Sequence, residues 1–144
     1  MISTALAREL RDAGVGWAPV SGDAFQLSPA MVDEGDFEGD VFTISDMTIE
    51  AHRFATGTVL GFNGTTEWAL DLVAQEDALW LPREDQLRDL LRGTFQRLER
   101  EADGDRIAYT VTIRLDGAPA AFRSDDPAEA YGRALLALAR SAAA

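Results

Sequence analysis

Hydrophobic residues recur at helical spacing near the start of the chain. Leu6 and Leu10 lie four positions apart within residues 3–13, which is typical of an amphipathic helix. Ser3 or Thr4 can cap this helix, since serine and threonine are both favourable N-cap residues. Gly14 follows it and supplies a C-terminal stop. The pattern therefore predicts a helix over residues 3–13.

Two further helices are predicted in the second half of the chain. One begins at Pro82, whose fixed φ suits a first turn, and its hydrophobic stripe is expected to comprise Leu87, Leu91, Phe95 and Leu98. The other begins at Asp126 and Pro127, and Glu129 completes the pattern of a capping box. Its inner stripe is expected to comprise Tyr131, Leu135 and Leu138.

Alternation with a period of two predicts strands. It is clearest over residues 107–115, and the pair Asp116-Gly117 then turns the chain into a partner strand at 118–123. Shorter strands are expected at 15–20, 25–27, 41–45, 48–54 and 58–62. Asn63-Gly64 is a strong hairpin signal. The residues after it, 65–73, fit either another strand or a short helix.

The order of elements favours one α+β domain over residues 1–144. Strands cluster along the chain instead of alternating with helices, which argues against a doubly wound sheet. We expect a mainly antiparallel sheet of about five to seven strands packed with three helices. A chain of 144 residues lies within the usual size of one domain.

Charge restricts the partners. The chain has 25 acidic and 13 basic residues, a formal net charge of -12, and no lysine. Nucleic acids and anionic membranes are disfavoured as partners, because both recruit basic surfaces. No stretch approaches the length of apolar residues that a membrane span requires. A protein partner or a second copy of the chain remains compatible with this charge.

Common catalytic signatures are missing from the sequence. With no lysine there is no P-loop, and with no cysteine there is no thiolate nucleophile or zinc finger. His52 is the one histidine and has no signature around it. The acidic run at 33–40 fails the EF-hand register, because Val41 and Met47 stand where glycine and glutamate are required. We therefore predict no cofactor, no metal and no catalytic residue, and the lack of cysteine favours a cytoplasmic location.

One segment combines a tight turn with polar and aromatic groups. Polar side chains beside aromatic surface are typical of a small-ligand pocket or of the centre of a protein interface, although a hairpin whose tryptophans fill the core has the same composition. The candidate binding residues are Asn63, Thr65, Thr66, Glu67, Trp68, Asp71 and Trp80.

Four stretches together resemble a family of small acidic actinobacterial proteins, some of which carry a pilus-assembly label. The stretches are residues 14–19, 61–71, 78–88 and 130–136, and the similarity covers most of the chain. The resemblance implies an actinobacterial, cytoplasmic origin and no particular activity. The label does not imply ATPase activity here, because the chain has no Walker A lysine.

The leading functional hypothesis is a non-catalytic binding or regulatory domain with a protein partner or self-association. The sequence leaves open whether the chain is an enzyme, and the missing catalytic signatures argue against enzyme activity. The alternative is a small carboxylate- or magnesium-dependent enzyme, in which Glu67, Asp71 and His52 are the first residues to suspect. A further alternative is an immunity-type protein that neutralises a basic toxin.

Overall fold

The computed structural model describes residues 1–27, 40–44, 49–54, 57–62, 72–74 and 77–143, and it gives the backbone alone for 49–54, 57–62 and 72–74. The chain forms two compact units. The first comprises Met1–Gly16 with Pro82–Ala144, and the second comprises Trp17–Leu81. The prediction of a single α+β domain over residues 1–144 stays a prediction.

The α+β class is confirmed. The described residues form three α-helices, but their strands do not join into one sheet of five to seven strands. They form three antiparallel sheets of three strands each, ordered β2-β1-β6, β3-β4-β5 and β7-β8-β9. Hydrophobic alternation predicts that a segment is a strand, but it does not determine which strand pairs with it, and this is why the expected sheet was too large.

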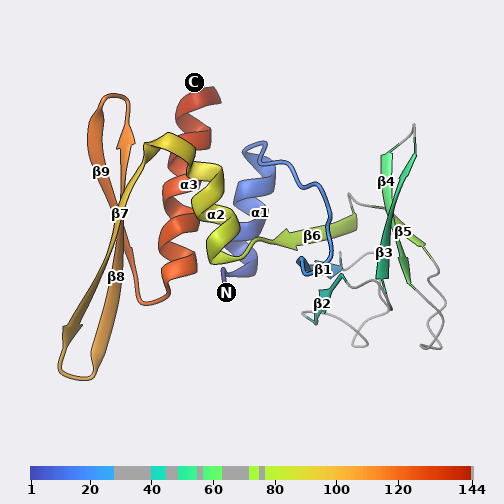
Figure 1. The fold of residues 1–144 in the computed structure, drawn as a ribbon, viewed down its shortest axis with the longest axis horizontal. Coiled ribbons are helices and arrows are strands. Elements are labelled where there is room, and N and C mark those ends of the chain that lie inside the picture. Colours follow the sequence, from blue (N-terminus) through green and yellow to red (C-terminus); the bar gives the residue numbers. More distant parts are fainter. Residues whose placement is uncertain (28–39, 45–48, 55–56, 63–71, 75–76, 144) are drawn as a thin grey trace. The chain divides into compact units, whose positions relative to one another are not determined.

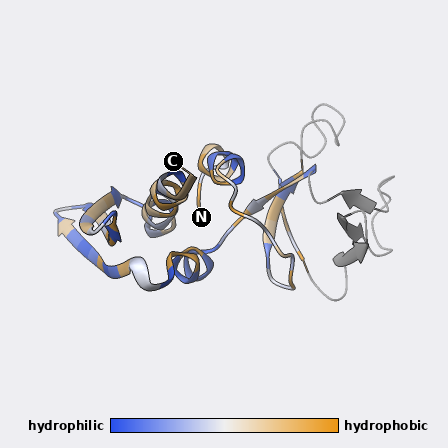
Figure 2. Cartoon of the chain, turned by 90° about the horizontal axis from the view of Figure 1, so that it is seen from above, coloured by the Kyte–Doolittle hydropathy of each residue, from blue (hydrophilic) through white to orange (hydrophobic). Residues whose placement is uncertain are grey.

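In the first unit, α3 (Pro127–Ala143) packs against β8 (Arg106–Leu115) and β9 (Ala118–Ser124). The helices α1 (Thr4–Asp12) and α2 (Glu84–Leu91) both contact α3 (Figure 1). Each helix has a hydrophobic and a hydrophilic side (Figure 2), and the hydrophobic sides supply the core. Its fully buried members include Leu87, Leu91, Val111, Ile113, Ala130 and Ala134.

The termini of α1 form as the sequence predicts. The hydroxyl oxygen of Ser3 accepts a hydrogen bond from the amide of Leu6, which caps the helix. Gly14 has a φ of 93°, a conformation that glycine adopts without a steric penalty. Leu6 and Leu10 are buried, so the predicted stripe faces the core.

The predicted helix from Pro82 to Leu98 was too long. Helix α2 ends at Leu91, where Arg92 takes a φ of 53° and begins a short 3₁₀ turn, Arg92–Thr94. Phe95 and Leu98 instead belong to β7 (Phe95–Asp103), which pairs with β8. A β-bulge between Phe95 and Arg97 changes the alternation, and this is how two apolar residues at helical spacing occur within one strand.

The hairpin between β8 and β9 confirms the predicted turn. Asp116 and Gly117 have φ angles of 50° and 82°, the positive values that a two-residue type I′ turn requires. The pairs beside this turn are Leu115 with Ala118 and Ile113 with Ala120. The strands that it joins form the middle and one edge of the sheet.

In the second unit, β1 (Ala24–Leu27) lies between β2 (Val41–Thr43) and β6 (Ala78–Leu81). The other sheet pairs β3 (Ile49–Phe54) and β5 (Leu72–Ala74) with β4 (Gly57–Phe62). His52 of β3 lies opposite Val59 of β4. These strands agree with most of the predicted ones, and β5 falls at the end of the stretch for which a strand and a helix were both considered.

An aromatic row crosses the first of these sheets. Phe42 and Trp80 flank Phe25 on neighbouring strands, and Trp17 stacks on Trp80 with 6.1 Å between ring centroids. The predicted strand at 15–20 does not form. Instead, the buried carboxylate of Asp23 accepts hydrogen bonds from the Trp17 indole at 2.9 Å and from the Val20 amide at 3.1 Å, which holds this segment as a loop.

Candidate functional site

A groove in the first unit lies between α1, α3 and β9, with a volume of about 360 Å³. Buried Leu6 and Leu136 and half-buried Phe122 and Ala137 provide apolar surface. Charged side chains share the lining and come from both helices. The complete lining comprises Ser3, Ala5, Leu6, Glu9, Phe122, Glu129, Arg133, Leu136, Ala137 and Arg140.

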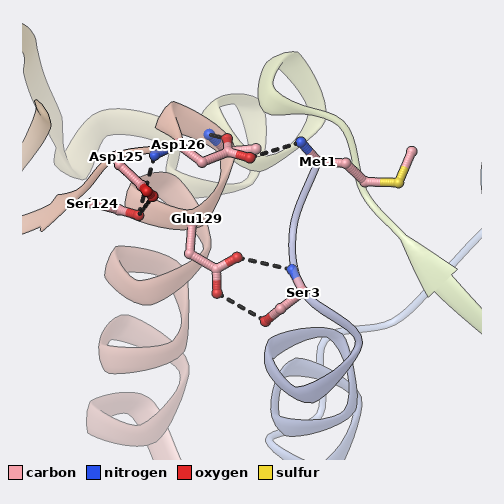
Figure 3. A network of polar contacts seen from close by, with 7 residues as sticks. Met1, Ser3, Ser124, Asp125, Asp126 and Glu129 are labelled. Carbon is pink, nitrogen blue, oxygen red and sulfur yellow. Dashed lines mark hydrogen bonds and ion pairs between the residues drawn. The ribbon is translucent and has the colours of Figure 1, made fainter. Parts of the chain in front are cut away.

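One end of the groove is held by Glu129. Its two carboxylate oxygens accept hydrogen bonds from the Ser3 amide at 2.8 Å and from the Ser3 hydroxyl at 2.9 Å (Figure 3). The sequence pattern predicted that Glu129 completes a capping box at the start of its own helix. Its carboxylate instead binds Ser3 of the first helix. Its carboxylate fixes the start of α1 against α3, and both residues of this contact line the groove.

Asp126 supports the same end. One carboxylate oxygen accepts a hydrogen bond from the Ala128 amide at 2.8 Å, which caps α3, and the other accepts from the Met1 ammonium group at 2.9 Å (Figure 3). Partial burial raises the pKa of Asp126, but the hydrogen bond and the charge of the Met1 ammonium group, together with hydrogen bonds from the Ala128 and Glu129 amides, outweigh burial and leave the pKa below its ordinary value. Asp126 is therefore ionised at neutral pH and stabilises both helix starts.

The cationic groups of the groove come from α3. A guanidinium nitrogen of Arg133 donates a 2.8 Å hydrogen bond to the backbone carbonyl of Arg123 on β9. Arg140 is exposed and has neither a hydrogen bond nor an ion pair within the described part of the chain. In a chain with a net charge of -12, an arginine without a carboxylate partner is available for a ligand.

The binding residues predicted from the sequence lie elsewhere. Asn63, Thr65, Thr66, Glu67, Trp68 and Asp71 are outside the described residues, so their convergence remains a prediction. Trp80 is on β6, and its buried indole nitrogen has no hydrogen-bond partner among the residues that the structure describes. The alternative enzyme hypothesis rests on Glu67, Asp71 and His52, whose side chains are likewise not described, and it also stays a prediction.

Sequence reasoning missed the groove, although part of its signal was visible. Glu129, Arg133, Leu136 and Arg140 recur at spacings of three and four, so they share one face of a helix. That face lies beside the stripe containing Tyr131 and Leu135, both of which are buried as predicted. The contribution of Phe122 and of α1 depends on tertiary packing, which no local pattern determines.

No known protein family, curated protein or solved structure matches this chain. The resemblance to an actinobacterial family therefore stays an expectation. Among the described residues no group of three or more acidic or histidine side chains gathers as a metal site would require, and no helix there is long and apolar enough to cross a membrane.

Proposed function

We propose that the protein is a non-catalytic binding domain that takes a polypeptide partner at the groove between α1, α3 and β9. The observation that carries the proposal is the combination of apolar surface from Leu136 and Phe122 with the guanidinium of Arg140, which no group of the described residues pairs. Apolar contact supplies affinity and a few charged groups fix orientation in most protein recognition sites. Among the described residues β9 is an edge strand of its sheet, so its outer side adds backbone hydrogen-bonding groups beside the groove.

The proposal includes an acidic, cytoplasmic protein whose partner is another protein or a second copy of the chain, not a nucleic acid or a membrane. The net charge of -12 supports this choice, since phosphate-bearing partners would be repelled. The lack of cysteine supports a reducing compartment.

Peptide selection followed by NMR tests the proposal. Random peptides displayed on phage are selected on the immobilised full chain, and each selected peptide is titrated into the ¹⁵N-labelled protein. We expect chemical-shift changes confined to α1, β9 and the part of α3 around Arg133. Changes confined to the second unit, or the absence of any selected peptide, would contradict the proposal.

A matched pair of variants sharpens this test. Ala137→Arg places a long charged side chain in the groove, and Ala102→Arg places the same side chain on exposed β7, away from it. Both variants should remain folded, since Ala137 is only half-buried and Ala102 is exposed. We expect A137R to lose peptide binding and A102R to retain it. Equal binding by both variants would place the interaction outside the groove.

A further inference from the structure

We propose that the polypeptide partner is a second copy of this chain, and that the two copies join their β9 strands in antiparallel pairing about a two-fold axis. In this pairing Ala121 of one copy lies opposite Ala121 of the other. The inference rests on the proposed polypeptide-binding function and names the partner of the groove. It follows from the backbone groups that β9 presents on its outer side.

The outward backbone groups of β9 follow from its pairing with β8. The residues on either side of the two-residue turn form a hydrogen-bonded pair, and such pairs alternate with non-hydrogen-bonded ones along an antiparallel ladder. Pro119, Ala121 and Arg123 stand at the non-hydrogen-bonded positions, so their backbone groups point away from β8. The carbonyl of Arg123 accepts a 2.8 Å hydrogen bond from Arg133 of α3, which agrees with this direction.

Two positions on this outer side do not pair with an added strand. Pro119 has no N–H, and the carbonyl of Arg123 already accepts from Arg133. An ordinary strand carries an N–H and a carbonyl at every residue, so in either direction it would leave two of its own groups without a counterpart. Four groups remain for a partner: the carbonyl of Pro119, the amide and the carbonyl of Ala121, and the amide of Arg123.

A second copy of β9 meets these four groups and leaves none of its own without a counterpart. When the two Ala121 residues lie opposite each other, Pro119 of each copy lies opposite Arg123 of the other. The Ala121 residues exchange two hydrogen bonds, and each Arg123 amide donates to the opposite Pro119 carbonyl. The position where Pro119 lacks an N–H then faces the Arg123 carbonyl that Arg133 occupies, so the two defects coincide.

Other registers of the same two strands fit less well. If Pro119 lies opposite Ala121, the Ala121 carbonyl of each copy faces a proline ring. If Ala121 lies opposite Arg123, each Ala121 amide faces an occupied carbonyl. A parallel second copy that keeps Ala121 paired also leaves two groups without a counterpart. Backbone pairing therefore selects the antiparallel register centred on Ala121, and the use of the same surface by both copies gives a closed dimer.

The side chains at the two edges of this sheet also favour β9 for self-pairing. The edge strand β7 carries a succession of charged side chains, including Glu99 and Glu101, and charges on an edge strand hinder the approach of another strand. Residues 118–122 of β9 carry no charge. Arg123 follows them and donates a 3.2 Å hydrogen bond to Glu101, so its guanidinium is held on its own copy. The uncharged stretch contains Ala121, on which the pairing is centred.

The same register brings an apolar side chain to the groove. Phe122 lines the groove, so the side chains of Ala120 and Phe122 lie on the α3 side of the sheet. In the dimer, Phe122 of each copy lies directly opposite Ala120 of the other, and directly opposite side chains lie on the same side of a sheet. Each Phe122 therefore lies beside the groove of the other copy. Phe122 and Ala137 are only half-buried in one copy, so this contact removes further apolar surface from water.

The register also gives Arg140 acidic neighbours. The Ser141 hydroxyl donates a 2.8 Å hydrogen bond to Asp116, which brings the end of α3 to the β8–β9 turn. In the proposed register this turn comes level with the end of β9 in the other copy, where Asp125 and Asp126 lead into α3. Arg140 lines the groove one residue before Ser141, so its guanidinium lies near these carboxylates of the other copy. Charge complementarity therefore adds to backbone pairing at both ends of the dimer interface.

The oligomeric state of the full chain tests the inference first. Analytical ultracentrifugation over a dilution series should show a reversible equilibrium between monomer and dimer. Ala121→Pro removes one outward amide from each copy, so two hydrogen bonds are lost, and we expect the dimer dissociation constant to rise about 30-fold or more. Ala121→Val keeps the amide at the same exposed position and should change the constant little. A wild-type chain that is monomeric at every concentration, or an A121P variant that is folded by circular dichroism and dimerises as wild type does, would overturn the inference.

Cysteine cross-linking tests the register, since the chain contains no cysteine of its own. Ala121→Cys places two thiols on directly opposite residues, whose Cα atoms are about 5.5 Å apart, within the range of a disulfide. Ala118→Cys is the control, because the same register separates its two thiols by about six residues along the strands, roughly 20 Å. We expect A121C to form a covalent dimer rapidly under mild oxidation and A118C to form much less. Equal cross-linking of the two variants would contradict the register.

A charge exchange tests the interface even if A121P fails to fold. Arg140→Glu and Asp125→Arg should each weaken the dimer, because each variant places like charges next to one another. An equimolar mixture of the two variants should dimerise more tightly than either alone, since opposite charges then meet at both ends of the interface. A mixture that dimerises no more tightly than its components would overturn the placement of Arg140.

The binding function and the self-pairing have separate outcomes. If selected peptides perturb the groove amides while the chain stays monomeric, self-pairing fails and the binding function stands. If the chain stays monomeric and no peptide perturbs the groove, both fail.

Discussion

Glu129 and Ser3 are separated by 126 residues, yet the Glu129 carboxylate accepts hydrogen bonds from both the amide and the hydroxyl of Ser3. The same hydroxyl caps α1 by accepting from Leu6. A single carboxylate thus positions the first helix on the last one. Because α1 and α3 are the two helical walls of the groove, this contact determines the shape of the candidate site.

Removing this carboxylate should loosen α1. Glu129→Ala loses two hydrogen bonds to an ionised acceptor, and we expect a loss of about 1 kcal/mol in the free energy of unfolding, since solvent access reduces the value of such contacts. Urea denaturation of the full chain measures it. Glu99→Ala, on the exposed β7 edge, is the control and should change stability by less than about 0.5 kcal/mol. Equal effects of the two substitutions would mean that Glu129 does not hold α1.

The lowered pKa of Asp126 predicts a pH-dependent contribution to stability. A carboxyl group whose pKa is lower in the folded than in the unfolded state stabilises the fold above the unfolded pKa, and this contribution is lost as the pH falls through the folded pKa. Asp126→Asn keeps an acceptor for the Ala128 amide but removes the charge. We expect wild type to be more stable than D126N at about pH 6, with the difference vanishing well below about pH 4. A difference that is constant over this range would contradict the assignment.

The close approach of α1 and α3 at Gly132 predicts a steric effect. A methyl group at this position would lie 2.6 Å from the Leu6 Cδ2 atom. Gly132→Ala should therefore destabilise the first unit by about 1–3 kcal/mol, despite the better helix propensity of alanine. The control is Gly93→Ala, since no atom of the described residues outside its chain neighbours lies within 4 Å of a methyl group added at Gly93. Adding Leu6→Ala to G132A should relieve the overlap, so the double variant should lose less stability than the sum of the two single variants. A loss equal to that sum would contradict a steric overlap between the two positions.

The buried carboxylate of Asp23 predicts a difference between two substitutions in the second unit. Asp23→Leu would leave the Trp17 indole and the Val20 amide without their acceptor, and we expect a loss of about 2–4 kcal/mol. Asp23→Asn retains a carbonyl acceptor and should lose less. Tryptophan fluorescence during denaturation follows this unit. Equal losses for the leucine and asparagine variants would show that the two hydrogen bonds contribute little.

Much of the first unit could be predicted from its sequence because local rules and tertiary packing agree there. The alternation over 107–115, the turn at Asp116-Gly117 and the start at Asp126-Pro127 each carry a sufficient local signal. The same rules failed at Phe95 and Leu98. Their spacing fits a helix, but the positive φ of Arg92 ends the helix before them. Phe95 and Leu98 then pair with residues of β8 as part of a strand. Pairing with a distant strand, and not the local helix propensity, therefore determines that this segment is a strand.

The groove could not be predicted because its walls come from distant parts of the chain. The charges of Arg133 and Arg140 were visible in the sequence, but nothing local indicates that Phe122 and Leu6 would lie beside them. The prediction of a strand at 15–20 was wrong for a related reason. Its backbone is held by the side chain of Asp23, and hydrophobic content alone could not reveal that bond.

The first unit is discontinuous, since residues 17–81 form a unit of their own between its two parts. During synthesis at the ribosome, α1 leaves the exit tunnel long before the helix that carries Glu129 and Gly132 exists. The apolar side of α1 therefore lacks its partner α3 while the inserted unit is translated. A chaperone that binds short amphipathic helices could bind α1 at this stage. Nascent chains arrested before α3 should be cleaved by protease within α1, and the intact chain should be protected at the same residues.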